Sequence, residues 1–138
     1  MAQKRIIVIG GSAAGPKAAA KARRIDESAD ITIIQKDPDL SMASCGYPYY
    51  VGGVFDDRNM LLSTPTGVVR NPMFFMNAKN IVARTGTEAV SINRAAKTVQ
   101  CKNLQTGQTE ELPYDSLILA TGSVPNMPPV PGMELAGI

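Results

Sequence analysis

The chain has 138 residues and a mass of 14.7 kDa, which is the size of one ordinary domain. Its composition, 44% hydrophobic and 19% charged, excludes a disordered tail, and the lack of any apolar run near ~20 residues excludes a membrane span. Fourteen basic and twelve acidic side chains give a net charge of +2 without a long run of either sign, so no nucleic-acid surface is expected.

The first predicted element is a β-strand over Arg5–Ile9, a β-branched run that ends in a glycine-rich turn. Pro16 fits only in the first turn of a helix, where its missing N–H is not needed, so a helix is predicted to begin near Ala13 or Ala14. The face of this helix that is expected to pack on the sheet carries Ala14, Ala18, Ala22 and Ile25. A second strand over Ile31–Ile34 completes a βαβ unit.

The middle of the chain has shorter elements. Residues 36–54 are rich in Pro, Gly and Tyr and predict a functional loop, with a short helix that starts at or after Cys45. A short apolar helix is predicted over Asn71–Ala78, and a strand over Ile81–Ala83 follows it. The loop therefore separates the βαβ unit from a second helix and strand.

The last third of the chain predicts mostly strands. Three alternating segments indicate a β-meander, over Ala89–Asn93, Thr98–Leu104 and Glu110–Leu112. Residues 115–122 predict one more buried strand that stops at Gly122, and the Pro-rich residues 125–138 predict a linker. The expected architecture is α/β, with the meander inserted between strands of a parallel sheet.

The glycine-rich turn is the strongest local signal for function. It consists of Gly10, Gly11, Ser12, Ala13, Ala14 and Gly15. Backbone N–H groups at a helix N-terminus can hold a pyrophosphate, so the turn predicts dinucleotide binding, and a tight turn without a ligand is the alternative. Ser12 replaces the second glycine of the GxGxxG pattern, and Gln35, about 20 residues further on, stands where a carboxylate usually contacts ribose hydroxyls.

Cys45 is the second signal, because a thiol at a helix start is shifted toward the reactive thiolate. It has no cysteine close by in the sequence, so it would react alone, through a mixed disulfide or a sulfenic acid; a buried structural cysteine is the alternative. Cys101 lies within a strand and is predicted to be a packing or surface thiol. With no histidine and two cysteines, no metal site is expected, and thiols without a secretion signal predict a cytoplasmic protein.

A basic stripe is predicted on the first helix. Lys17, Lys21 and Arg24 follow one another at helical spacings of four and three. Such a stripe is more often a solvated face than a site. It would be functional if a phosphorylated substrate lay across the helix.

Three segments together resemble the FAD-dependent pyridine nucleotide-disulfide oxidoreductases: the glycine turn, the SxxxCGxPYYxGG pattern of residues 41–53, and the LATGS run of residues 119–123. The most similar branch has a single redox cysteine and contains coenzyme A-disulfide reductase, NADH oxidase, NADH peroxidase and coenzyme A-linked persulfide or polysulfide reductases. The resemblance covers the whole chain. It implies the N-terminal part of a doubly wound, Rossmann-like FAD-binding domain with a β-meander insertion.

The resemblance also implies a domain organisation and a cofactor site. Residues 1–124 would belong to the FAD-binding domain, and residues 125–138 would be a linker toward an NAD(P)H-binding domain that the chain lacks. The residues implied to contact FAD are Gly10, Gly11, Ser12, Ala13, Ala14 and Gly15 at the pyrophosphate, Gln35 and Lys36 at the adenosine ribose, the backbone of Val90 at the adenine, Ser44 and Cys45 beside the flavin, and Ala120, Thr121 and Gly122 over the cofactor.

The implied activity is NAD(P)H-dependent reduction of coenzyme A disulfide, persulfide or polysulfide, in which Cys45 is the catalytic thiol. Coenzyme A contacts in the family map onto Lys17, Lys21, Arg24, Ser41, Ser44 and Lys79. The expected partners are therefore coenzyme A or another small-molecule thiol or disulfide, with NAD(P)H as co-substrate and no membrane or nucleic acid. The parent enzyme is expected to be a homodimer, and this chain alone is expected to be inactive.

Two positions bear on the choice within the branch. Ala13 stands where NADH peroxidases of this kind carry a histidine, which disfavours a peroxidase. Ser44 stands where coenzyme A-disulfide reductases carry asparagine, so an NADH oxidase that cycles Cys45 as a sulfenic acid stays an alternative. A non-catalytic nucleotide-binding fragment is the other alternative.

Overall fold

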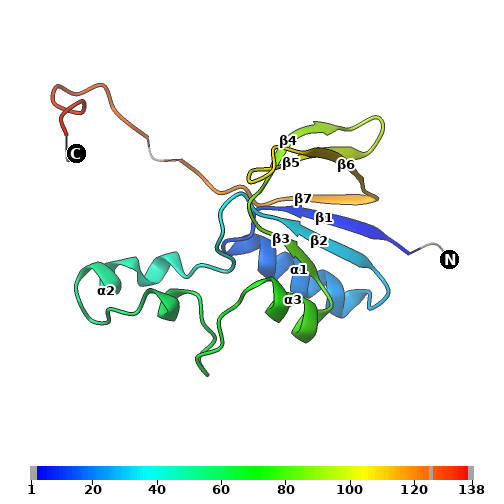
Figure 1. The fold of residues 1–138 in the computed structure, drawn as a ribbon, viewed down its shortest axis with the longest axis horizontal. Coiled ribbons are helices and arrows are strands. Elements are labelled where there is room, and N and C mark those ends of the chain that lie inside the picture. The colour runs from blue at the N-terminus through cyan, green and yellow to red at the C-terminus, as the bar shows by residue number, and fades with distance from the viewer. Residues whose placement is uncertain (1–2, 125, 137–138) are drawn as a thin grey trace.

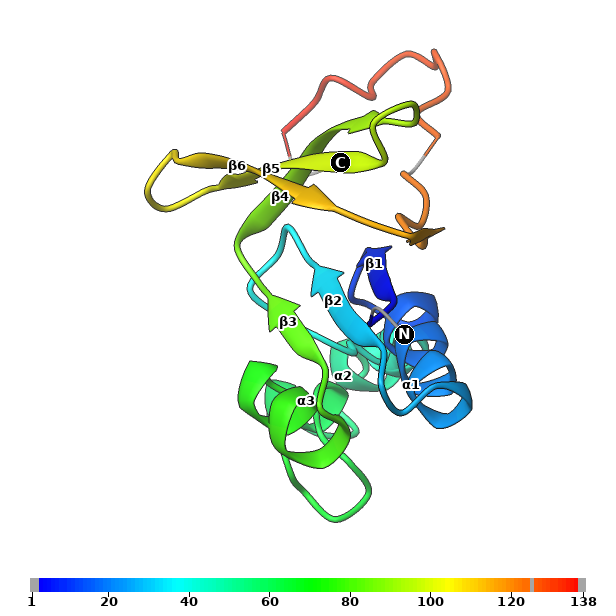
Figure 2. The same ribbon diagram turned by 90° about the vertical axis from the view of Figure 1, so that its right-hand side faces the viewer.

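The computed structural model describes residues 3–124 and 126–136, and it has three layers (Figures 1 and 2). The middle layer is a parallel sheet in the order β3-β2-β1-β7. Its strands are β1 (Arg5–Ile9), β2 (Asp30–Ile34), β3 (Val82–Arg84) and β7 (Ser116–Leu119). Helices α1 (Ala14–Ile25) and α3 (Pro72–Lys79) cover one face.

The other face of the parallel sheet is covered by an antiparallel sheet in the order β4-β5-β6. These strands are β4 (Thr87–Asn93), β5 (Thr98–Asn103) and β6 (Thr109–Pro113). The predicted β-meander is therefore confirmed, as is the α/β, Rossmann-like fold class. The strand predicted over Ile81–Ala83 is present one residue later, and the apolar helix begins at Pro72, after its N-cap Asn71.

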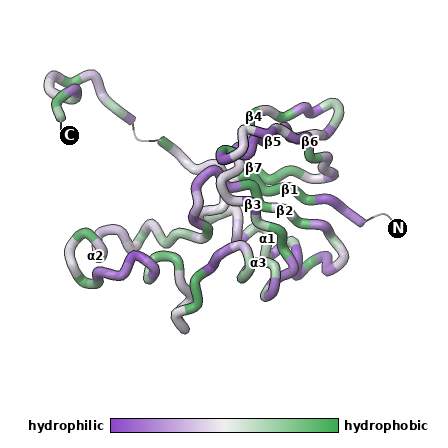
Figure 3. The backbone as a smooth tube through the Cα atoms, viewed as in Figure 1, coloured by the Kyte–Doolittle hydropathy of each residue, from purple (hydrophilic) through white to green (hydrophobic). Residues whose placement is uncertain are grey.

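Strand β1 shows why both faces of the parallel sheet are apolar. Ile6 and Val8 pack in a core with the helices, whereas Ile7 and Ile9 pack in a second core with the antiparallel sheet. Side chains alternate between the two faces of a strand, so a run of consecutive aliphatic residues fills both cores. Figure 3 shows this as hydrophobic colour along β1 and β2. Cys101 belongs to the second core and is fully buried there, which confirms a packing role.

Helix α1 begins where the sequence predicts, with Ala13 as its N-cap residue, but it buries a different face. Its buried residues include Gly15 and Ala19, whereas Ile25 is 73% exposed. The expected face of Ala14, Ala18, Ala22 and Ile25 is therefore wrong in part, since of these only Ala22 packs against the core. Gly15 determines the rotation, because a Cβ at this position would overlap the carbonyl oxygen of Gly10.

The segment between β2 and α3 projects away from the sheet, as Figure 1 shows. It contains a 3₁₀ turn over Ser44–Gly46, helix α2 (Tyr47–Val51) and a second 3₁₀ turn over Arg58–Leu61. The predicted short helix at Cys45 is thus confirmed. Residues 126–136 of the expected linker form turns and irregular structure, and Pro125, Gly137 and Ile138 lie outside the described residues.

Candidate functional site

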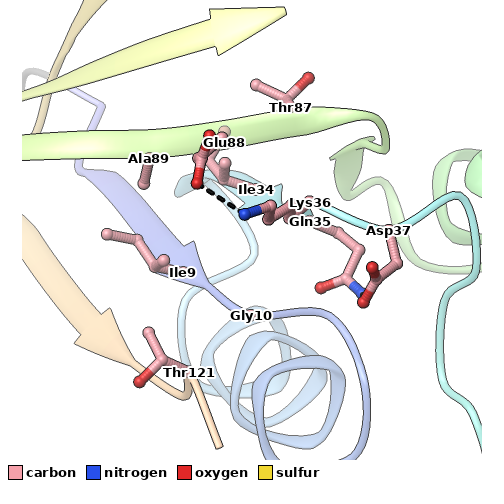
Figure 4. A pocket seen from close by; sticks show the side chains of 10 residues that line it. All are labelled: Ile9, Gly10, Ile34, Gln35, Lys36, Asp37, Thr87, Glu88, Ala89 and Thr121. Carbon is pink, nitrogen blue, oxygen red and sulfur yellow. Dashed lines mark hydrogen bonds and ion pairs between the residues drawn. The ribbon is translucent and has the colours of Figure 1, made fainter. Parts of the chain in front are cut away.

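The first candidate site is a cavity of about 260 Å³ where the parallel strands end (Figure 4). We call it the strand-end cavity. Its lining residues are Ile9, Gly10, Ile34, Gln35, Lys36, Asp37, Thr87, Glu88, Ala89 and Thr121. They follow the carboxyl ends of β1, β2 and β7 and include one end of β4. The carboxyl edge of a parallel sheet is the usual place for a ligand in this type of fold.

Of the residues of the glycine turn, Gly10 lines the strand-end cavity. Gly10 has a φ of +105° and lies so close to β7 that a Cβ there would overlap the carbonyl oxygen of Ala120, so only glycine fits. No side chain caps the N-terminus of α1 at Ala13, and its first turn contains no acidic residue. The first N–H groups and the positive end of the helix dipole are therefore available to an anion.

Gln35 is a buried polar residue that lines the strand-end cavity, and it is only 8% exposed. Its Oε1 accepts a hydrogen bond from the Gly11 N–H at 2.7 Å, and its Nε2 donates to Oδ2 of Asp37 at 3.3 Å. The substitution of glutamine for the usual carboxylate therefore leaves a side chain that is already hydrogen-bonded to the glycine turn.

Lys36 and Glu88 form an ion pair across the opposite part of the cavity, with Nζ and Oε1 2.8 Å apart (Figure 4). The hydrogen bond to Glu88 raises the pKa of Lys36 and lowers that of the glutamate. The pair connects the end of β2 to β4, so the cavity is bounded by both sheets. Both side chains are solvent-accessible, which limits the contribution of the pair to stability.

Some of the other residues expected at the cofactor lie at the strand-end cavity, and others are exposed and do not line it. Thr121 lines the strand-end cavity, and Ala120 borders Gly10 through its backbone. Gly122 has a φ of +73° and is exposed. Val90 does not line the cavity and is 54% exposed at a register shift between Ala89 and Ser91, whereas its neighbour Ala89 lines the cavity.

Cys45 lies in the 3₁₀ turn that leads into α2, and it is an exposed free thiol. The loop that carries it is attached to the glycine turn, because the Ser41 N–H donates to the Gly11 carbonyl at 2.7 Å. Ser41 has a φ of +55°, which turns the chain at this point. Cys101, unlike Cys45, is buried, and this burial raises the pKa of the Cys101 thiol and keeps it protonated.

The second candidate site is a cavity of about 270 Å³ between α1, α3 and the loop that precedes α3, and we call it the basic cavity. Its lining residues are Pro16, Lys17, Ala20, Arg24, Ser41, Thr64, Arg70, Phe74, Phe75 and Lys79. Four of the six residues expected to contact coenzyme A are therefore brought together here. Lys21 and Ser44 do not line it. Viewed along the axis of α1, Lys21 and Ala20 lie on opposite sides of Lys17.

Arg70 is the cation that sequence reasoning missed. Its Nε donates to the Leu62 carbonyl at 3.1 Å and its Nη2 donates to the Ser63 carbonyl at 2.6 Å, so it ties the 62–70 loop into one wall of the basic cavity. The only sequence signal was an arginine immediately before the N-cap Asn71. Nothing in that local pattern indicates which surface the arginine lines.

Within residues 3–124 and 126–136, no helix is long and apolar enough to cross a membrane. The same residues contain no group of three or more histidine, cysteine, aspartate or glutamate side chains arranged to hold a metal ion.

Comparison with known proteins gives one family. The family described as pyridine nucleotide-disulphide oxidoreductase matches residues 4–138. A coenzyme A disulfide reductase from Staphylococcus epidermidis is 38% identical over 122 residues, which are 88% of this chain and 26% of that protein. The chain thus spans about a quarter of the length of the curated relatives that it matches.

Two solved structures agree with this result. A NAD-dependent persulfide reductase from A. fulgidus has a TM-score of 0.90 and 43% identity, over 96% of this chain and 24% of that one. The reduced CoADR-RHD of Bacillus anthracis has a TM-score of 0.85 and 36% identity, over 97% of this chain and 23% of that one. In both cases the similarity covers nearly all of this chain.

Proposed function

Because the chain belongs to the pyridine nucleotide-disulphide oxidoreductase family, we propose that it is the FAD-binding part of an NAD(P)H-dependent flavoprotein that reduces coenzyme A disulfide, coenzyme A persulfide or polysulfide. Cys45 is the redox thiol of this proposal. The observation that carries the choice of substrate is the basic cavity, which gathers Lys17, Arg24 and Lys79 beside the loop that leads to Cys45.

The residues at the carboxyl edge of the parallel sheet fit FAD. The uncapped start of α1 would hold the pyrophosphate, Gln35 would face the adenosine ribose, and Thr121 would lie over the cofactor. When bound, FAD supplies the chemistry that passes two electrons from a nicotinamide to sulfur. In this chain Gly15 allows α1 to approach the end of β1 closely, and Gly10 allows a close approach of the segment that follows β7.

The role of Cys45 follows from thiol–disulfide exchange. Its thiolate attacks one sulfur of a disulfide RSSR, forms the mixed disulfide Cys45–S–SR and releases RS⁻. Two electrons and one proton then return the Cys45 thiolate and release RSH, with the electrons derived from NAD(P)H. A single protein thiol is sufficient for this cycle, and Cys101 is excluded from it by complete burial among the residues of the second core.

The basic cavity would bind the phosphate groups of a coenzyme A substrate. Ammonium and guanidinium groups form short, charge-assisted hydrogen bonds with phosphate. Phe74 adds an apolar wall to the same cavity, and Lys79 Nζ lies 6.0 Å from the centroid of its ring. A cavity with cations on one side and an aromatic ring on another suits a ligand that carries both phosphates and a flat apolar group.

The experiment that tests the proposal replaces Cys45 with serine in the full-length protein. We expect Cys45→Ser to abolish NAD(P)H-dependent reduction of coenzyme A disulfide while the bound flavin, measured by absorbance, stays near one per chain. Cys101→Ala is the control, because it removes the second thiol of these 138 residues and should retain turnover. Reductase activity in Cys45→Ser would contradict the single-thiol mechanism, and a colourless wild-type protein would contradict FAD binding.

A further inference from the structure

The strand-end cavity contains a second carboxylate close to the position where the expected one is missing. Gln35 stands at the end of β2, and Asp37 lies two residues further on and lines the same cavity. Figure 4 shows the Gln35 amide beside the Asp37 carboxylate. The loss of the acid at position 35 therefore does not remove negative charge from this part of the cavity.

The orientation of the Gln35 amide is determined by its two partners. The Gly11 N–H can only donate, so it requires Oε1, and a carboxylate oxygen of Asp37 accepts, so it requires Nε2. An amide nitrogen carries two hydrogens, and the bond to Asp37 uses one of them. Neither of these two hydrogen bonds uses the second Nε2 hydrogen.

The backbone around both residues is held firmly. The Gln35 N–H donates to the Arg84 carbonyl at 2.9 Å, and the Gln35 carbonyl accepts from the Thr87 N–H at 3.0 Å. The Asp37 carbonyl accepts from the Gly86 N–H at 3.4 Å. The turn between β3 and β4 thus positions Gln35 and Asp37 together.

A glutamate at position 35 would not suit this arrangement. One of its oxygens could accept from Gly11, but the other would replace Nε2 and stand about 3.3 Å from the Asp37 oxygen, with like charges facing each other. The amide at position 35 and the acid at position 37 are therefore compatible as a pair.

We propose that Asp37 supplies the carboxylate of the adenosine-ribose site. It accepts a hydrogen bond from one ribose hydroxyl, while Gln35 Nε2 donates to the oxygen of the adjacent ribose hydroxyl. The inference rests on the proposed binding of FAD. The pair then recognises a vicinal diol by one acceptor and one donor, instead of by the two oxygens of a single carboxylate. Asp37 is exposed and the Gln35 side chain is nearly buried, so the contact lies at the cavity surface.

The test measures FAD affinity in the full-length protein after removal of its flavin, by quenching of flavin fluorescence. We expect Asp37→Asn to weaken FAD binding about tenfold or more, because it removes a hydrogen bond to a charged acceptor. Gln35→Glu should also weaken binding. The double variant Gln35→Glu/Asp37→Asn restores one carboxylate and one amide, and it should bind FAD within about threefold of wild type.

Two further measurements isolate the ribose contact. Adenosine diphosphate and its 2′-deoxy analogue compete with FAD, and the wild-type preference for the ribose form should fall in Asp37→Asn. Asp56→Asn is the matched control, since Asp56 is exposed in the 52–57 loop, lines neither cavity and loses the same charge. Melting temperatures show whether each variant is folded.

The outcomes separate this inference from the proposed function. Wild-type protein that binds no FAD would overturn the proposed function. Wild-type protein that binds FAD, together with an Asp37→Asn variant of equal affinity or a double variant no better than the single ones, would overturn the role of Asp37 alone.

Discussion

The two cavities are built from different parts of the chain. The strand-end cavity is bounded by backbone at strand ends, and its key polar residue is held by main-chain hydrogen bonds on both sides. The basic cavity depends on long side chains that come from α1, α3 and the 62–70 loop. A cavity made of backbone is specified by glycines and strand register, whereas a cavity made of lysine and arginine side chains depends on which helix faces meet.

The largest expected effect breaks the strand-end cavity. Gly15→Ala places a methyl group against the Gly10 carbonyl, where the backbone cannot yield without moving β1 or α1. We expect a loss of about 2–4 kcal/mol in the free energy of unfolding, measured by urea denaturation, together with loss of nucleotide binding. Ala14→Ser changes an exposed neighbour in the same helix turn and should remain within about 0.5 kcal/mol of wild type. Equal stability of Gly15→Ala and wild type would contradict the close approach.

The second prediction tests which basic residues of α1 belong to the basic cavity. Lys17→Gln and Arg24→Gln should each raise the KM for coenzyme A disulfide about tenfold or more, because each removes a charge-assisted contact to phosphate. Lys21→Gln removes the same charge from the same helix but outside the lining, and we expect less than a twofold change. Steady-state kinetics in the full-length protein checks this. If the enzyme reduces oxygen or peroxide instead, the KM for that acceptor should be unchanged in all three variants.

The smallest expected effect concerns the ion pair between Arg5 and Asp115, which lies outside both cavities and therefore serves as a reference for the variants within them. The Asp115 carboxylate accepts from the Arg5 backbone N–H at 2.8 Å and pairs with its guanidinium at 3.0 Å, which lowers the pKa of Asp115 to about 2. A carboxyl pKa that is lower in the folded state stabilises the fold above the unfolded value near 4, and this contribution is lost as the pH falls from about 4 to about 2.

Asp115→Asn should therefore lower the melting temperature slightly at pH 7 and by a smaller amount at pH 2. The difference should shrink in high salt, because the pair is exposed and screened. Thermal unfolding at the two pH values measures it. A larger destabilisation at pH 2 than at pH 7 would show that the sign of this argument is wrong.

Features that depend on neighbouring residues in the chain could be predicted from the sequence. The glycine turn, the helix start near Ala14 that Pro16 indicates, and the meander follow from local turn and capping chemistry, and all three are present. The buried face of α1 could not be predicted, because Gly15 and Ala19 are small enough for any face. The close contact of Gly15 with Gly10 and Val8 decides the rotation, and the spacing of apolar residues within the helix does not show this contact with the end of β1.

The same reason explains the partial prediction of the candidate site. Gln35 and Thr121 follow strands whose ends were visible in the sequence, and the structure places both on the strand-end cavity. The positions of Lys21 outside the basic cavity and of Arg70 within it depend on how α1, α3 and the 62–70 loop are arranged around that cavity in the tertiary structure. Helical spacing alone treats Lys17, Lys21 and Arg24 as equal. Only the tertiary contact distinguishes them.

The shared strand β1 has a consequence for how the protein unfolds. Its alternate residues belong to two cores, one with the helices and one with the antiparallel sheet. Loss of β1 from the sheet would expose both cores together. Opening measured by hydrogen exchange should therefore be cooperative across the two layers, with amides of β1 and β5 exchanging through the same global event.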